Sequence, residues 1–394
     1  MSRGRILSRN KHWSLYGICL LFVALWCISP PLFINGAARV MALVSMIIAL
    51  RLGRIYHRRY FAMLVFYVTY TLGIGLFKQG IEYFLLNIQA YIIFAFAYIA
   101  VNKDEKNDGT IYNFDKIIKV VEWIYPIWMI ITLRAYNSIP NISRLLANNN
   151  NENVVVWSQQ GIGGYGMIYS LVFYNIILLY ILLNKGKKRI LTAVNYILSL
   201  VTIIMAGYSI ALIAVLLGSI IVLFIREKRV ERIILVIFVA GILYALFLMF
   251  QTEIFNGLLS LADGTMYEQK IKDIINSFTE ANAQGTLESR TILYQYSWET
   301  FLKNPFVGSA FSEKLMFGGH SFFLDTFAKF GLIGGIPFLY LLLYYPIRCI
   351  RKNKEFSLSL AILVLMIFVG GLNNLSAAFA PMVYVVYPAL VKDD

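Results

Sequence analysis

Residues 321–347 read SFFLDTFAKFGLIGGIPFLYLLLYYPI, and only Asp325 and Lys329 in this stretch are charged. About 20 apolar residues are enough for a helix to cross the hydrocarbon core of a bilayer. The stretch therefore predicts a membrane-spanning helix. Counted from His320 it would be about 42 Å long against a core of about 30 Å, so the helix must tilt, bend or begin outside the core. Gly331 and the pair Gly334–Gly335 mark the expected bend or close helix contact.

The composition of the whole chain agrees with this stretch. Of its 394 residues, 59% are hydrophobic and 14% are charged, which is too few polar residues to cover the surfaces of soluble domains. The formal net charge of +14 would suggest a nucleic-acid partner in a soluble protein. In a membrane protein, basic residues hold the cytoplasmic loops inside, so topology explains the excess and no nucleic-acid partner is expected.

Apolar stretches predict an all-α polytopic membrane protein with about twelve transmembrane helices in a single domain, residues 1–394. The expected spans are 13–34, 38–50, 60–77, 83–101, 117–133, 162–183, 190–206, 209–225, 233–250, 321–347, 356–373 and 377–391. Most of the 35 Lys and Arg residues fall in every second loop. This alternation predicts that both termini are cytoplasmic.

Two of the predicted outer loops are long. The first covers residues 134–161, and the second, just before the tenth span, covers 251–320. Loops of this length usually carry function unless they are disordered. Mixed helical spacing of apolar residues over 291–302, ended by Asn304-Pro305, predicts a helix that lies against the membrane surface.

His320 is the one histidine expected on the outer face, because His12 and His57 lie in basic cytoplasmic segments. It stands between Gly319 and Ser321 at the start of the long apolar helix. A glycine there permits a tight backbone approach, and a helix N-terminus presents free N–H groups that favour an anion. A functional role and a merely interfacial histidine are both compatible with this pattern.

Four further charged residues could contact a substrate at the outer face. Arg290 suits a phosphate through bidentate hydrogen bonds, and Arg144 in the first outer loop has the same capacity. Either arginine could instead be an ordinary surface residue. Asp325 and Lys329 are four residues apart and can pair on one helix face near a cavity. Glu122, within the fifth span, could be a structural group or a transport carboxylate.

Motifs that are missing narrow the chemistry. The sequence holds no nucleotide-binding phosphate loop, no glycine-rich dinucleotide motif and no Asp-x-Asp pair on the outer face. Metal-assisted glycosyl transfer would lack its usual oxygen ligands, so we expect no metal and no cofactor.

The region from Ser289 to Leu343 resembles the signature region of bacterial O-antigen polymerases and O-antigen ligases. That signature holds an arginine, an amphipathic stretch that ends in Asn-Pro with a glycine soon after, a histidine followed by a small polar residue, and Gly-x-x-Gly in the next helix. Here these are Arg290, Asn304-Pro305 with Gly308, His320-Ser321, and Gly331 with Gly334. An Arg-x10-Gly pattern often described for the polymerases is absent at Arg144 and Arg290.

The resemblance implies a GT-C-like membrane glycosyltransferase of the bacterial inner (cytoplasmic) membrane. It would polymerise undecaprenyl-diphosphate-linked oligosaccharide units into O-antigen or capsular polysaccharide, without a metal and with inversion of the anomeric carbon. His320 would accept the proton of the acceptor hydroxyl, and Arg290 with the helix N-terminus would stabilise the departing diphosphate. Arg144, Asp325, Lys329, Gly319 and Ser321 are the candidate substrate-binding residues.

Other functions remain compatible with the sequence. An O-antigen ligase would transfer the glycan to lipid A core, and a flippase for lipid-linked oligosaccharides has a similar number of spans. Charged candidates gather at the outer face and Glu122 alone lies within a span, which favours surface chemistry over transport. Expected partners are the lipid-linked donor and acceptor, the bilayer and, as a further possibility, a chain-length regulator and a flippase.

Overall fold

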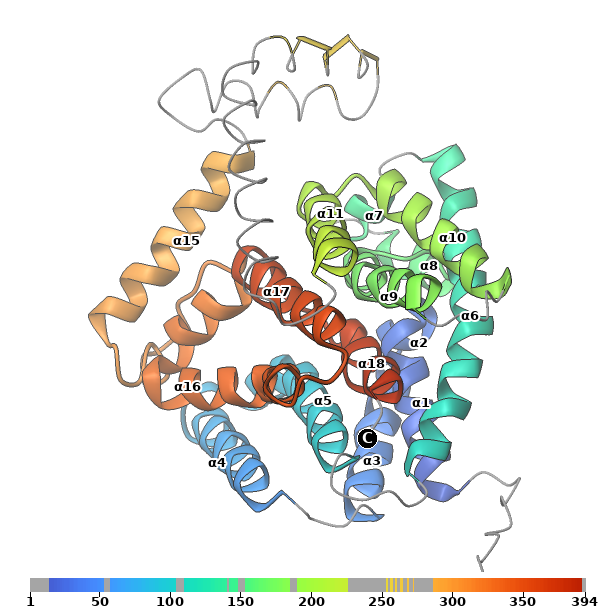
Figure 1. The fold of residues 1–394 in the computed structure, drawn as a ribbon. Helices are drawn as coiled ribbons and strands as arrows, with labels where there is room; N and C mark the ends of the chain where they lie inside the picture. Colours follow the sequence, from blue (N-terminus) through green and yellow to red (C-terminus); the bar gives the residue numbers. More distant parts are fainter. Residues whose placement is uncertain are drawn as a thin grey trace, which may run out of the picture.

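The computed structural model describes residues 14–52, 57–103, 110–139, 142–147, 153–184, 190–225 and 286–391, with a few positions between 253 and 272. Within these ranges every regular element is a helix (Figure 1), so the predicted all-α class is confirmed there. The predicted span at 233–250 lies outside the described residues.

The helices follow one another closely along the chain. The first group is α1 (Leu15–Ile28), α2 (Pro30–Ile34), α3 (Gly36–Leu52), α4 (Arg58–Ile74), the π-helical η1 (Gly75–Gln79), α5 (Ile81–Lys103) and α6 (Thr110–Ser138). The second group is α7 (Ile142–Leu145), α8 (Val154–Gln159), α9 (Tyr165–Asn184), α10 (Ile190–Ala206) and α11 (Ser209–Phe224). The third group is α15 (Thr286–Lys303), α16 (Phe322–Arg351), α17 (Phe356–Leu372), η2 (Ala377–Phe379), η3 (Met382–Val386) and α18 (Tyr387–Leu390).

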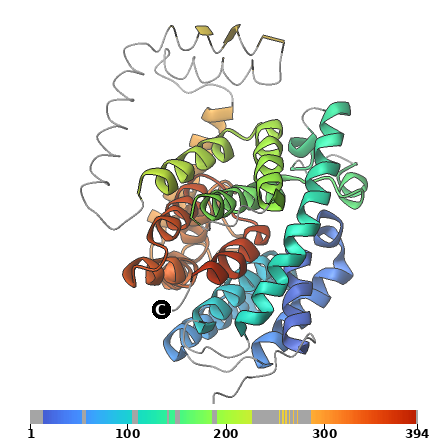
Figure 2. The same ribbon diagram turned by 45° about the vertical axis from the view of Figure 1, so that its right-hand side comes forward.

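Helix α9 is largely enclosed by other helices. It is apolar around its whole circumference, and a helix of that kind must be covered on all sides. Helices α10, α11 and α17 pack against it. Figure 2 shows α6 as a long teal rod along one side of the bundle, while α15 and α16 lie on the side away from α6 in Figure 1.

In the part of the chain that the structure describes, three helical segments are long and apolar enough to cross a membrane: Arg58–Phe77, α9 and α16. Shorter apolar helices accompany them: Leu15–Ile28, Asn87–Asn102, Ile190–Ala206, Ser209–Phe224, Phe356–Leu372 and Ala377–Leu390. These helices fit a membrane protein, and the total of twelve spans stays a prediction. Helix α6 continues to Ser138, so the first residues of the predicted first outer loop, 134–138, are helical.

Helix α16 is broken at Gly331, whose backbone angles of φ 58° and ψ −156° are not helical. The turn after α15 satisfies the backbone groups that the break releases. Leu332 N donates to Pro305 O at 2.8 Å, Ile333 N to Phe306 O at 3.0 Å, and Ser309 N to Ala328 O at 2.8 Å. A Cβ at Gly331 would lie 2.3 Å from the backbone of Phe306. The bend expected from the glycines is therefore confirmed.

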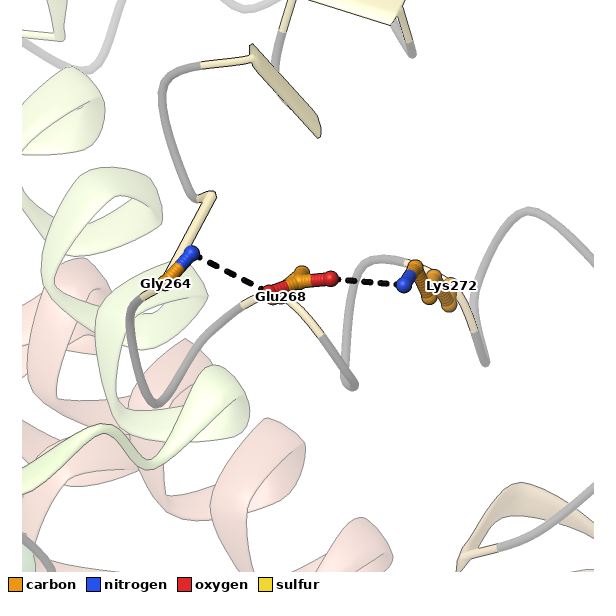
Figure 3. A network of polar contacts seen from close by, with 3 residues as sticks. All are labelled: Gly264, Glu268 and Lys272. Atoms are coloured by element: carbon orange, nitrogen blue, oxygen red, sulfur yellow. Dashed lines mark hydrogen bonds and ion pairs between the residues drawn. The ribbon is translucent and has the colours of Figure 1, made fainter.

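The described positions of the second outer loop include one exposed charged network (Figure 3). Glu268 accepts from Lys272 Nζ at 2.6 Å and from Gly264 N at 3.1 Å. Both charged side chains are substantially exposed. An exposed i, i+4 pair of this kind contributes little to stability, because solvent and salt screen it.

Candidate functional site

The turn that carries His320 is fixed to α15 by a chain of buried hydrogen bonds. Gly318 N donates to Ser297 Oγ at 2.7 Å, and Ser297 Oγ donates to Asp325 Oδ1 at 2.6 Å. The second oxygen of Asp325 accepts from Ser321 N at 3.2 Å. A side chain at position 318 would collide with the Leu293 carbonyl, so glycine is required where the turn touches α15.

The segment after α17 holds the same turn from its other side. Phe322 N donates to Asn373 O at 3.1 Å, and the side-chain amide of Asn374 donates to Gly319 O. Tyr294 on α15 donates its hydroxyl to Leu372 O at 2.6 Å. The position of His320 is thus determined by contacts from α15, α16 and the end of α17.

His320 is half-buried, and its imidazole makes no hydrogen bond to any residue that the structure describes. Burial lowers the pKa of His320 below its usual 6.5, and the positive charge of Arg290 lowers it further. Asp325 acts in the opposite direction. The imidazole is therefore neutral at pH 7 and able to accept a proton.

Arg290 reaches the same region from the first turns of α15. Its charge acts on His320 and on the hydroxyls of Tyr165 and Tyr169 at the start of α9. Burial raises the pKa of the Tyr294 hydroxyl, one turn further along α15, and the charge of Arg290 opposes this effect. Arg290 forms no ion pair with any described residue, and its side chain hydrogen-bonds to the Tyr294 hydroxyl.

Arg144 approaches these tyrosines from the first outer loop. It is exposed on the short helix α7, with its guanidinium 5.9 Å from the centre of the Tyr208 ring. The rings of Tyr165, Tyr169 and Tyr208 form one cluster with centroids 4.7–5.9 Å apart. The structure therefore brings Arg144 and Arg290 to one group of tyrosines, and Arg290 also acts on His320.

Two expectations about the start of α16 are wrong. Asp325 and Lys329 do not form an ion pair within the described part of the chain, because both Asp325 oxygens accept the hydrogen bonds given above. The Lys329 ammonium instead lies 3.6 Å from the centre of the Phe317 ring. The helix N-terminus also offers few free N–H groups, since Ser321 caps it through a 3.2 Å hydrogen bond from Leu324 N.

Gly319 and Ser321 differ in what they contribute beside His320. Gly319 has φ +85°, a conformation that L side chains rarely adopt, and space around its Cα is open. Ser321 is fully buried and serves as the cap of α16. Direct contact of either residue with a substrate stays a prediction.

Two cavities of different polarity flank this region. A mostly polar cavity of about 240 Å³ has Asn87, Asp325, Lys329 and Asn374 in its wall. A mostly apolar cavity of about 340 Å³ lies between α1, α2 and the first outer loop. Its wall includes Phe33, Ile34, Leu146, Val154, Ile162 and Tyr165. Gln89 belongs to both walls.

Sequence reasoning missed the tyrosines, Gln89 and the pair Asn373–Asn374. Asn373 and Asn374 could have been found from the sequence, because two adjacent amides at the end of an apolar span need hydrogen-bond partners. Tyr165, Tyr169 and Tyr208 looked like ordinary interfacial aromatics.

Glu122 lies away from these residues, on the wall of a third cavity of about 380 Å³ with Asp115, Lys119 and Tyr174. Its side chain is buried, and its backbone carbonyl accepts from Asn195 Nδ2 at 3.0 Å. The structural and transport interpretations of Glu122 both remain open.

Fold and site together define a helical membrane protein with one histidine and two arginines gathered at the ends of its spans. Residues 194–339 match the sequence pattern of the O-antigen ligase family, and this stretch contains Arg290, His320 and the break at Gly331. This match supports the O-antigen ligase and polymerase superfamily, and the resemblance in sequence is confirmed. Arg144 lies outside the matched stretch. No curated protein matches the chain.

Proposed function

We propose that this protein is a polysaccharide polymerase, a glycosyltransferase that joins undecaprenyl-diphosphate-linked repeat units at the outer face of the bacterial inner membrane. The observation that carries the proposal is the arrangement of a neutral, half-buried His320 beside Arg290, with Arg144 at the same tyrosine cluster. The family match supports the wider class of membrane enzymes that act on lipid-linked glycans.

In this mechanism His320 is the general base. It accepts the proton of the acceptor hydroxyl while that oxygen forms a bond to the anomeric carbon of the donor sugar. The lowered pKa keeps the imidazole unprotonated at neutral pH, and the hydrogen bonds to Gly319 and Phe322 hold the backbone around it. Attack opposite the leaving group inverts the anomeric carbon.

The leaving group is the undecaprenyl diphosphate, whose negative charge increases as the glycosidic bond breaks. Arg290 and Arg144 stabilise this charge, and the planar guanidinium suits the diphosphate oxygens. The buried hydroxyls of the tyrosine cluster are neutral, so they can donate hydrogen bonds without repelling the anion. These groups replace the helix N-terminus in the original hypothesis.

The two cavities fit the two parts of a lipid-linked glycan. The polar cavity presents amides, Asp325 and Lys329, which suit sugar hydroxyls. Its volume of about 240 Å³ is below the usual range for drug-sized ligands, so it would hold little more than one sugar ring. The apolar cavity suits the first isoprenoid units of the carrier lipid.

The O-antigen ligase is the second candidate, since it shares the donor and differs in the acceptor. Purified protein supplied only with lipid-linked repeat units separates the two. Growth of a glycan ladder supports the polymerase, whereas a product that forms only after addition of lipid A core identifies a ligase. Movement of the intact lipid-linked unit from one leaflet of a vesicle membrane to the other, with no new glycosidic bond, would instead identify a transporter.

The site assignment is tested by His320→Ala and Arg290→Ala in a deletion strain. We expect each variant to lose long-chain polysaccharide while protein level and membrane insertion stay unchanged. Lys314→Ala is the matched control, because this exposed lysine lies in the same turn region. Polysaccharide of full length from both variants would refute the assignment.

A further inference from the structure

The length of the second half of α16 indicates where the two boundaries of the hydrocarbon core lie along this helix. From Leu332 to Arg351 it contains twenty residues, which span about 30 Å and match the hydrocarbon core. The helix ends in Arg348 and Arg351, which suit the headgroups at one boundary. The break at Gly331 therefore lies at the opposite boundary.

Helix α9 gives a second position of the membrane boundary, on the same side as the break in α16. It also contains twenty residues, so Tyr165 lies at one boundary of the core and Asn184 at the other. Tyr165 donates its hydroxyl to Asn374 O at 2.7 Å, and Asn374 in turn contacts Gly319. The beginnings of α9 and α16 therefore lie on the same side of the membrane.

Each end of α15 lies near one of these two boundary positions, and near its beginning Tyr294 donates its hydroxyl to Leu372 O at the end of α17 at 2.6 Å. Near its beginning, the charge of Arg290 acts on Tyr165 and Tyr169. After its end, Pro305 and Phe306 accept hydrogen bonds from the break in α16. Arg290 and Leu302 are about 18 Å apart along the helix axis. Because both ends lie at the level of the boundary, α15 runs roughly parallel to the membrane plane, beside the first half of α16 (Figure 1).

The exposed surface of α15 has two apolar edges separated by a polar ridge. Trp298 and Leu302, 49% and 55% exposed, form the first edge. Gln295 and Glu299 form the ridge, joined by a 2.8 Å hydrogen bond. The second edge holds Ile292 and Tyr296.

Within the described residues, the first edge continues as an apolar surface beyond the end of α15. Phe306, which is 67% exposed, follows Leu302 after the Asn304-Pro305 turn. The carbonyl of Phe306 accepts a hydrogen bond from Ile333 N. Ile333 and Ile336 are exposed apolar residues of the spanning part of α16. The apolar surface of the span thus continues onto the Trp298–Leu302 edge.

We propose that α15 is an interfacial helix whose Trp298–Leu302 edge, together with Phe306, is immersed in the outer leaflet of the membrane. Tryptophan and phenylalanine are favoured at this depth, and Lys303 can extend its ammonium to the headgroups. The helix then holds Arg290 at the level of lipid phosphates. This inference concerns membrane contact alone and stands whether or not the protein is a polymerase.

Site-directed labelling of the full chain in nanodiscs of phosphatidylethanolamine and phosphatidylglycerol tests the proposal. Cys19, Cys27 and Cys349 are all buried, so a thiol-reactive bimane will label introduced exposed cysteines selectively. Trp298→Cys, Leu302→Cys and Phe306→Cys probe the proposed contact. Gln295→Cys, Glu299→Cys and Ile292→Cys are matched controls on the same helix. Size-exclusion chromatography verifies that each variant is folded.

We expect labels at 298, 302 and 306 to show blue-shifted emission, quenching by lipids with a nitroxide on the acyl chain, and loss of quenching by aqueous iodide. Labels at 295 and 299 should show the reverse. Lipid quenching at 292 with iodide quenching at 298 and 302 would place the wrong edge in the membrane and overturn the proposal. Iodide access at all six positions, or protection of the first three from both quenchers by other protein, would overturn it as well.

Discussion

The two predicted outer loops each bring an arginine to one tyrosine cluster, but the two arginines are held in different ways. Arg290 is half-buried on an eighteen-residue helix that is fixed by Ser297, Asp325 and Tyr294. Arg144 is exposed on a four-residue helix, and its guanidinium lies 5.9 Å from the centre of the Tyr208 ring. A preorganised charge stabilises a transition state more than a mobile one does. The second loop should therefore carry most of the chemistry.

The largest expected effect comes from Arg290→Lys. Lysine keeps the charge but loses the planar, two-point donor geometry, so we expect turnover to fall by about 100-fold. Turnover is measured as chain growth on lipid-linked repeat units by purified protein. A variant with wild-type turnover would show that Arg290 acts only as a surface charge.

Asp325→Ala should have a comparable effect through the position of His320. The change removes both acceptors that bind Ser297 and Ser321, and unsatisfied buried groups cost about 1–3 kcal/mol of unfolding free energy. Displacement of the base by about 1 Å can cost about 100-fold in rate. Thermal unfolding in detergent and turnover are measured together. The exposed Asp263→Ala serves as control, and an unchanged Asp325→Ala enzyme would contradict the anchoring role.

Arg144→Lys should have a smaller effect. Arg144 is exposed and lies outside residues 194–339, the stretch that the family model matches. We therefore expect a loss of about tenfold in turnover, equivalent to about 1.4 kcal/mol of transition-state stabilisation. An effect as large as that of Arg290→Lys would remove the contrast between the loops.

The protonation of His320 gives a finer test. Its pKa is lowered by burial and by Arg290, so the imidazole should protonate only below pH 6.5 and turnover should rise with pH through this region. In Arg290→Gln one lowering influence is gone, and the pKa of His320 should move upward. The chain has three histidines, so NMR titration of histidine-labelled protein, assigned with His320→Ala, can follow the shift. A downward shift would contradict the proximity of Arg290.

The smallest effect is expected for Glu268→Gln. The hydrogen bond and charge of Lys272 hold the pKa of this carboxyl below its usual value, but the pair is solvent-exposed. Exposed pairs are screened and weak, so turnover and thermal unfolding should stay within error of wild type. A clear loss of turnover would show that this part of the second loop also reaches the site.

The sequence by itself determined the all-α class and the bend at Gly331, because hydrophobic length and glycine content are local properties of the chain. It also indicated Arg290 and His320 as candidate site residues, and that assignment stays a prediction. Tertiary structure alone decided what surrounds those residues. Asp325 accepts from Ser297 and forms no ion pair with Lys329, since a buried carboxylate takes the donors that packing supplies, and Ser297 is 28 residues away in sequence. Tyr165 and Tyr169 lie near Arg290, and Tyr208 lies near Arg144, only because tertiary packing brings the beginnings of α9, α11 and α15 together, which no local pattern encodes.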